Sequence, residues 1–172
     1  ATFDGHRSND TLPHVFVSDN LGQSWKSLRS NLPDSAGSVR AILEDSRNED
    51  VLYLGAEFGI YVSIDRGESW TRFNSNLPTV PVHDLAQHDT MNELVAGTHG
   101  RSVWITDISA LGQIDQDALD ADAMLYEPTD VHMRARGKDR GSIGLHAFKA
   151  QNPEFGAAIY YSFTKKPRNA SL

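Results

Sequence analysis

Two aspartates, Asp84 and Asp89, are the carboxyl groups best placed for catalysis in this 172-residue sequence. Both lie near the start of a repeated β unit, where loops are expected to face a central cleft. Two carboxyl groups facing one cleft, about 5 Å apart for retention or about 6.5–9.5 Å apart for inversion, can hydrolyse a glycosidic bond. Glu57 and Asp107 are weaker candidates for the same chemistry. The alternative interpretation is that all four are solvated carboxylates in turns.

Histidine and arginine residues near these aspartates provide candidate binding groups. Imidazole titrates near neutral pH and ligates metals, so His83, His88 and His99 could act in acid–base or metal chemistry. No His-x-x-x-His spacing supports a metal site, and we predict neither a metal nor a cofactor. His99 and Arg101 are the candidate binding residues. Arg101 could hold a carboxylate or phosphate, or form an ion pair between β units, and His99 could instead hydrogen-bond within a turn.

The composition narrows the classes of partner. The net charge is -7, with 16 Lys and Arg against 23 Asp and Glu. Because binding to nucleic acid depends on a basic surface that neutralises phosphates, we expect no nucleic-acid partner. No apolar run approaches the ~20 residues that span a bilayer. Cysteine is absent, which excludes disulfides and thiolate metal sites.

A repeat of about 45 residues predicts the elements that position these candidates. The segments 18–25 and 63–70 share Ser, Gly, Ser and Trp at the same places, and Asn31-Leu32-Pro33 recurs as Asn76-Leu77-Pro78. A period of this size is typical of an array of similar supersecondary units, none of which buries its apolar face alone. The repeat therefore indicates the architecture before it indicates any chemistry.

Strand patterns within the repeat favour one blade of a β-propeller. The complete repeat predicts four short strands at 39–45, 51–56, 60–64 and 70–73. The following repeat predicts three, at 81–86, 93–98 and 102–106, and the sequence upstream supplies only the last two, near 14–17 and 25–28. Four short strands joined by hairpins within about 45 residues describe a propeller blade.

The repeat pattern stops after Leu111. Asp115 is expected to cap a short helix that runs through Ala123, and residues 157–163 resume strand character. We therefore predict an all-β fold. It comprises an incomplete propeller of about two and a quarter blades (1–111), a helical linker (112–128) and the beginning of a small C-terminal β domain (129–172).

The repeated motif Ser-x-Asp-x-Gly-x-Ser-Trp resembles the Asp-box of sialidase-like (BNR) propellers. Its Asp can accept hydrogen bonds from backbone amides of the hairpin, its Gly adopts a positive φ easily, and its Trp buries a large ring. In the first copy Asn replaces Asp, which keeps an acceptor without its charge. We expect a structural role for the eight motif residues, which are Ser18, Asn20, Gly22 and Trp25, then Ser63, Asp65, Gly67 and Trp70.

A wider resemblance covers most of the chain. Residues 96–105 resemble the last-blade signature of large bacterial BNR or sortilin-like repeat proteins often labelled glycosyl hydrolases, and 119–128 and 152–161 resemble the helix and β domain that follow. The resemblance implies a secreted, periplasmic or cell-surface propeller that binds a peptide or glycan or serves as a scaffold. The alternative is part of a glycoside hydrolase acting on polysaccharide or oligosaccharide. No spacing marks Arg40, Arg72 and Arg101 as the arginine triad of a sialidase.

The length limits what residues 1–111 can form alone. Propellers close with typically four to eight blades of about 40–45 residues each, so even four blades exceed this segment. We expect either a fragment of a longer protein or a chain that another chain completes. The expected partners are thus the remaining blades of a parent protein, or another chain, together with a possible glycan or peptide ligand.

Overall fold

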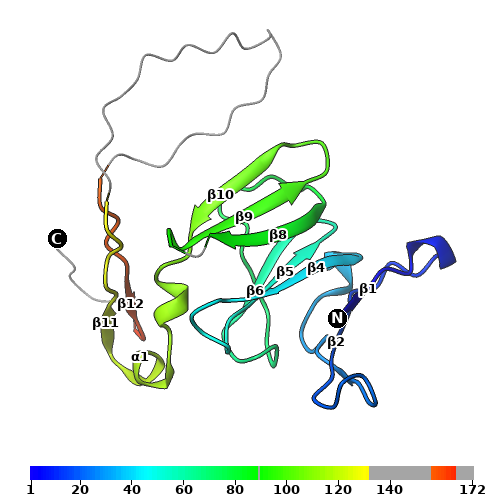
Figure 1. Cartoon of the computed structure of the whole chain (residues 1–172), viewed down its shortest axis with the longest axis horizontal. Coiled ribbons are helices and arrows are strands. Elements are labelled where there is room, and N and C mark those ends of the chain that lie inside the picture. The colour runs from blue at the N-terminus through cyan, green and yellow to red at the C-terminus, as the bar shows by residue number, and fades with distance from the viewer. Residues whose placement is uncertain (89, 132–155, 166–172) are drawn as a thin grey trace, which may run out of the picture.

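The computed structural model describes residues 1–88, 90–131 and 156–165, and they form antiparallel β-sheets with very little helix (Figure 1). The first sheet contains β1 (Thr2–Phe3), β2 (His14–Val17) and β3 (Lys26–Ser27). The central sheet contains β4 (Val39–Glu44), β5 (Leu52–Ala56), β6 (Gly59–Ser63) and β7 (Thr71–Arg72). The third contains β8 (Val82–His88), β9 (Glu93–Thr98) and β10 (Val103–Asp107). The prediction of an all-β fold is confirmed.

The remaining elements are short. A two-stranded sheet pairs β11 (Ala123–Leu125) with β12 (Tyr161–Phe163). The α-helix α1 spans Gln116–Asp120, and 3₁₀ helices span His6–Ser8, Asp34–Ala36 and Leu111–Gln113. None of the helices among the described residues has the length and apolar character needed to cross a membrane. In the described part of the chain, the sheets do not close into a ring.

The main differences from the sequence-based prediction lie near the two ends of the chain. The first sheet has a third strand, β1, whose two residues pair with Val15 and His14 and are too few to show a periodic pattern. The helix capped by Asp115 ends at Asp120 rather than at Ala123, because Ala121 is extended (ψ 139°) and leads into β11. The last strand begins at Tyr161 rather than at residue 157.

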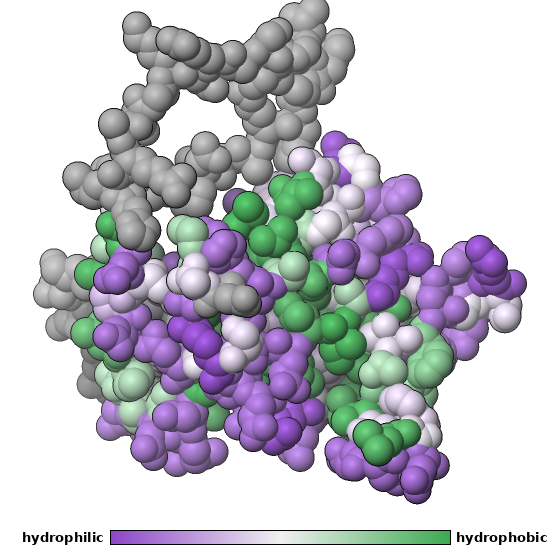
Figure 2. All heavy atoms as spheres, viewed as in Figure 1, coloured by the Kyte–Doolittle hydropathy of each residue, from purple (hydrophilic) through white to green (hydrophobic). Residues whose placement is uncertain are grey.

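The central sheet is buried because both of its faces are covered. Along β5, Leu52, Leu54 and Ala56 pack in a cluster with residues of the first sheet. Tyr53, from the opposite face of the same strand, packs with residues of the third sheet such as Val82. Alternate side chains of a strand point to opposite faces. The apolar run 51–56 therefore serves two cores at once, and Figure 2 shows part of the apolar surface as a band between hydrophilic areas.

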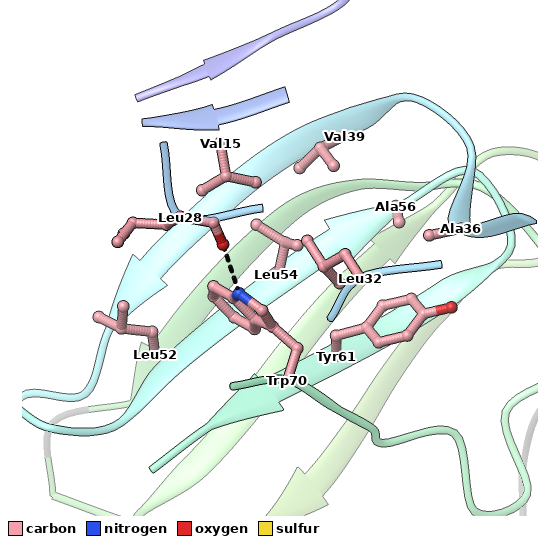
Figure 3. Packing of buried hydrophobic residues seen from close by; sticks show 10 residues of the cluster. All are labelled: Val15, Leu28, Leu32, Ala36, Val39, Leu52, Leu54, Ala56, Tyr61 and Trp70. Carbon is pink, nitrogen blue, oxygen red and sulfur yellow. Dashed lines mark hydrogen bonds between the residues drawn. The ribbon is translucent and has the colours of Figure 1, made fainter. Parts of the chain in front are cut away.

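Trp70 is the largest side chain in the core between the first and central sheets (Figure 3). Its ring lies among Val15, Leu28 and Leu54, and its Nε1–H donates a 2.8 Å hydrogen bond to the carbonyl oxygen of Leu28. Asn31 holds the Trp70 backbone from both sides: Oδ1 accepts from Trp70 N at 2.7 Å, and Nδ2 donates to Trp70 O at 3.1 Å. The indole thus joins two successive sheets.

The two turns before Trp25 and Trp70 have nearly the same backbone. Leu21 and Arg66 have φ of 56° and 55°, and the glycines that follow, Gly22 and Gly67, have φ of 87° and 89°. Positive φ at successive residues is unfavourable except where glycine takes one of the two places. The two copies of the sequence motif therefore form turns whose φ angles agree residue by residue.

Gly55 provides a test of how closely the central and third sheets pack. A Cβ at this position would lie 2.9 Å from the backbone oxygen of Val82 and 3.0 Å from its Cγ1. We expect Gly55→Ala to lower the free energy of unfolding by about 1–3 kcal/mol through overpacking. Gly97 occupies the equivalent position in β9, but its Cβ would meet nothing closer than 3.6 Å. The free energy of unfolding of Gly97→Ala, measured by urea denaturation, should therefore be close to that of the wild type. Equal losses of stability in Gly55→Ala and Gly97→Ala would refute this explanation.

Candidate functional site

Equivalent β-bulges lie at the start of the central and third sheets. The register between β4 and β5 shifts between Val39 and Ala41, and the register between β8 and β9 shifts between Val82 and Asp84. Arg40 and His83 are the extra residues of these bulges. A bulge re-aims a side chain and is over-represented beside active sites. Because β4 and β8 contact each other, the two bulges bring Arg40 and His83 to the same end of neighbouring sheets.

Arg40 binds two carboxylates. Its Nη1 lies 2.8 Å from Asp4 Oδ2, which follows β1, and its Nη2 lies 2.8 Å from Glu57 Oε2, which follows β5. His6 Nδ1 contacts the same Asp4 oxygen at 2.7 Å. Hydrogen bonds that involve ionised groups are stronger than neutral ones. This network therefore fixes the ends of β1, β4 and β5 relative to one another.

The environment of Asp4 stabilises its charged form. Burial by itself raises the pKa of Asp4, but hydrogen bonds from the backbone and side chain of His6 and from Ser38, with the charge of Arg40, lower it from 3.8 to about 2. A carboxyl group with this pKa stays ionised at neutral pH and cannot serve as a general acid there. The role of Asp4 is to hold Arg40.

The lowered pKa of Asp4 predicts a pH dependence of stability. Its contribution to the free energy of unfolding is complete above pH 3.8, the unfolded value, and is lost as the pH falls toward about 2. We expect Asp4→Asn to be less stable than wild type at pH 6, and the difference to shrink steadily between pH 4 and pH 2. Urea denaturation of both proteins across this range measures it. A difference that does not change with pH would contradict the prediction.

His83 and His99 take the equivalent places in the third sheet. His83 is the bulge residue of β8, as Arg40 is of β4, and His99 follows β9, as Glu57 follows β5. Their ring centroids are 4.9 Å apart and their planes are tilted by 43°. We call Asp4, Arg40, Glu57, His83 and His99 the polar rim. The rim offers two imidazoles and an ion-pair network to a ligand at one end of the sheets.

The other candidate residues from the sequence do not belong to the polar rim. Asp84 is exposed and accepts a 2.9 Å hydrogen bond from the amide of Leu85, while Asp89 lies outside the described residues. Arg101 is exposed in the turn after His99, and its carbonyl oxygen accepts from Trp104 Nε1 at 2.9 Å. His88 is at the far end of β8 from His83. The structure thus brings His83 and His99 together, and leaves His88 apart.

The motif residues hold the two turns through their side chains. In the second copy, Asp65 Oδ1 accepts from Ser63 Oγ at 2.7 Å and from the amide of Ser69 at 2.8 Å, and Ser63 Oγ accepts from the amide of Gly67 at 2.7 Å. In the first copy, Ser18, Asn20 and Ser24 make the corresponding hydrogen bonds, including 2.7 Å from Gly22 N to Ser18 Oγ and 2.9 Å from Ser24 N to Asn20 Oδ1. Trp25 differs from Trp70 in being 50% exposed. Trp70 packs against the sheet that precedes its own, and no sheet precedes that of Trp25 among the described residues.

An acidic cleft of about 1030 Å³ lies at the opposite end of β9 and β10 from His99. Its lining includes three acidic residues, Glu93, Asp107 and Glu127, together with Arg47. Asp107 Oδ1 accepts from the amide of Ser109 at 2.7 Å. Burial, followed by the charge of Asp107 and a hydrogen bond to it, raises the pKa of Tyr160. Of the acidic residues in this cleft, only Asp107 is a candidate from the sequence. The other two, Glu93 and Glu127, come from different segments of the chain, and their proximity depends on the fold.

The described residues contain no group of three or more histidine, aspartate or glutamate side chains arranged to hold a metal ion. Where a carboxyl group among these residues has a shifted pKa, at Asp4, Asp10 and Asp65, the shift is downward. Comparison with protein-family models, curated proteins and solved structures yields no match to this chain. Its function must therefore be inferred from its own geometry.

Proposed function

We propose that this chain is part of an Asp-box β-propeller of a secreted, periplasmic or cell-surface protein, and that it binds a ligand at the polar rim. Three observations support the propeller. Successive antiparallel sheets have equivalent strand orders, the Asp-box-like turns share their dihedral angles, and a buried tryptophan joins one sheet to the one before it. In this arrangement β4 and β8, the first strands of their sheets, line the central axis.

The equivalent bulges in β4 and β8 are the main observation that supports the polar rim as the binding site. Arg40–Glu57 and His83–His99 occupy equivalent positions, so the central and third sheets each present one pair of polar side chains at the same end. Neutral imidazole offers one donor and one acceptor, which suits the hydroxyl groups of a sugar or the amides of a peptide. Phe58, which is exposed beside Glu57, adds an apolar surface for the face of a sugar ring.

Binding to an array of neutral and anionic oligosaccharides tests this function. We expect His83→Ala and His99→Ala to weaken the binding of the best oligosaccharide by more than about tenfold, which corresponds to about 1.4 kcal/mol. Asp107→Asn, in the acidic cleft at the other end of the strands, should leave it unchanged. Loss of binding only in Asp107→Asn, or no binding by wild type, would reject the rim as a glycan site.

The acidic cleft favours one second candidate, a glycoside hydrolase. Hydrolysis needs two carboxyl groups facing one cleft, about 5 Å or about 6.5–9.5 Å apart, and Glu93, Asp107 and Glu127 share this cleft. Release of reducing sugar from the oligosaccharides on the array would support this candidate if Asp107→Asn abolished it. If Asp84→Asn abolished it instead, the catalytic group would be at the rim end.

A further inference from the structure

The core between the central and third sheets has no tryptophan at the place that Trp70 takes in the preceding core. Trp104 packs against this core, but it stands on β10 where Tyr61 stands on β6. The chain has three tryptophans, Trp25, Trp70 and Trp104. None of the described residues that follow β10 forms a fourth strand along this sheet. The amide of Ile108 instead donates to the carbonyl oxygen of Asn92 at 2.8 Å, and Gly112 packs beside the guanidinium of Arg47. In the described part of the chain, β10 thus has an outer edge with no strand paired to it.

A small groove lies where the equivalent of Trp70 would sit. Its volume is about 50 Å³, and its lining includes Ile60, Phe73 and Leu77, which belong to the central sheet or the turn after it, and Leu94, Ala96 and Trp104 from the third sheet. The first three correspond to Val15, Leu28 and Leu32, which pack with Trp70 in the preceding core.

Hydrogen bonds establish this correspondence. The amide of Leu28 donates to Val15 O, and the amide of Phe73 donates to Ile60 O, both at 2.8 Å. Ser30 and Ser75, two residues further along in each case, have φ of 37° and 39°. The backbone that surrounds Trp70 in one core is therefore repeated around the groove in the next.

Polar groups around the groove are also suited to a strand. Asn76 is exposed and lies 45 residues after Asn31, whose side-chain amide holds both the N–H and the C=O of Trp70. The carbonyl oxygen of Phe73 corresponds to that of Leu28, the acceptor for the Trp70 indole. Asn74 Nδ2 is buried and has no hydrogen-bond partner among the described residues, although its Oδ1 accepts from Ile60 N at 3.0 Å. A buried amide N–H group without an acceptor costs free energy, and a bound segment that supplied a carbonyl oxygen would remove this cost.

We propose that this groove, together with the outer edge of β10, is a docking site for an extended segment of another polypeptide that carries a tryptophan. The segment adds to the third sheet as β7 adds to the central sheet, where Tyr61 and Val62 pair with Arg72 and Thr71. Its indole enters the groove, continuing the core between the central and third sheets. Asn76 then holds the backbone of the incoming tryptophan. Strand addition to a sheet edge is a recurring mode of peptide recognition, in which the backbone gives affinity and the side-chain pocket gives specificity.

This site does not require that the sheets form a propeller, because it depends only on the equivalence of two cores. None of the residues of the polar rim lines the groove, whose lining comes from Ile60 of β6, the turn at 73–77, β9 and β10. Failure of peptide docking and failure of oligosaccharide binding are therefore separate results.

The probe is a fluorescein-labelled synthetic peptide with the sequence of residues 62–73, which carries Trp70 and its turn, added to the full chain and followed by fluorescence anisotropy. We expect saturable binding, and at least about tenfold weaker binding of the same peptide with alanine in place of the tryptophan. In the protein, Asn76→Ala should weaken binding about two- to tenfold, as expected for the loss of hydrogen bonds. Thr106→Asp, which places a charge in the groove beside Leu94, should weaken it more than about tenfold.

The control is Val103→Asp on the same strand. Val103 lies on the opposite face of β10 from Thr106 and does not line the groove, so Val103→Asp should change affinity by less than a factor of about two. Amide chemical shifts of ¹⁵N-labelled protein should change at 73–77 and 103–106. Equal binding of the alanine peptide, shifts confined to 28–32, or self-association of the protein that the peptide does not reverse would each overturn the proposal.

Discussion

Trp70→Ala is expected to lower the free energy of unfolding by about 3–5 kcal/mol, the range for truncating a buried tryptophan. Trp70 is 4% exposed and packs with Val15, Leu28 and Leu54. Its removal leaves a cavity between two sheets and leaves the carbonyl oxygen of Leu28 without its donor. Urea denaturation followed by far-ultraviolet circular dichroism measures the loss without relying on indole fluorescence.

The chain offers its own control in Trp25, which occupies the same place in the repeat but is 50% exposed. Trp25→Ala should cost at most about 1 kcal/mol, because surface substitutions have small effects. Trp70→Phe separates the two contributions, since it keeps most of the packing and removes the indole donor. Comparable losses for Trp25→Ala and Trp70→Ala would mean that the core in Figure 3 does not depend on the indole.

Asp65→Ala is expected to lower the free energy of unfolding by about 2–3 kcal/mol, because hydrogen bonds to charged groups contribute about 1.5–3 kcal/mol each and this turn is partly exposed. The carboxylate accepts from Ser63 Oγ, from the amide of Ser69 and from Ser69 Oγ. The turn that it holds places Trp70 against Leu28 and Gly67 over the Leu28 side chain. Loss of the turn therefore weakens the sheet contact as well as the hairpin.

The matched variant is Asn20→Ala, in the exposed first turn, with an expected loss of about 1 kcal/mol because its acceptor is neutral. The two positions also differ in pH dependence. Burial raises the pKa of Asp65, but hydrogen bonds from Ser63 and Ser69 and from the amide of Glu68 outweigh it and lower the pKa below 3.8. The contribution of Asp65 is thus present above pH 3.8 and lost on acidification below it, whereas that of Asn20 does not titrate. A loss in Asp65→Ala that is the same at pH 3 and pH 7 would contradict this account.

The sequence predicted the strands well where an apolar run lies between turn residues. Residues 93–98 and 14–17 form the strands β9 and β2 within the expected bounds, because apolar runs of strand length and turn residues are local signals. The run 51–56 was recognised as a strand, and its burial on both faces follows from sheets on either side of it. The strand β1 escaped detection because two residues carry no period.

The candidate site was less accessible from the sequence. His99 was identified, but its contact with His83 depends on a register shift between β8 and β9, which is a property of strand pairing and not of either strand alone. Asp4, Arg40 and Glu57 come together from positions up to 53 residues apart. The places of Asp84 and Asp89 along the chain are visible in the sequence, whereas the pairing of charges across sheets leaves no such signal there.

The bulges at Arg40 and His83 place polar side chains at the end of each sheet, apart from the apolar clusters that stabilise it. Each adds one side chain outside the apolar clusters, on a backbone whose geometry is repeated in the next unit. Substitutions there, such as arginine–glutamate for histidine–histidine, change the polar groups at this end of the sheet without removing a residue of either apolar cluster. An array built from such units could therefore diversify one unit at a time, and the order of the exposed pairs would act as a modular code for what it recognises.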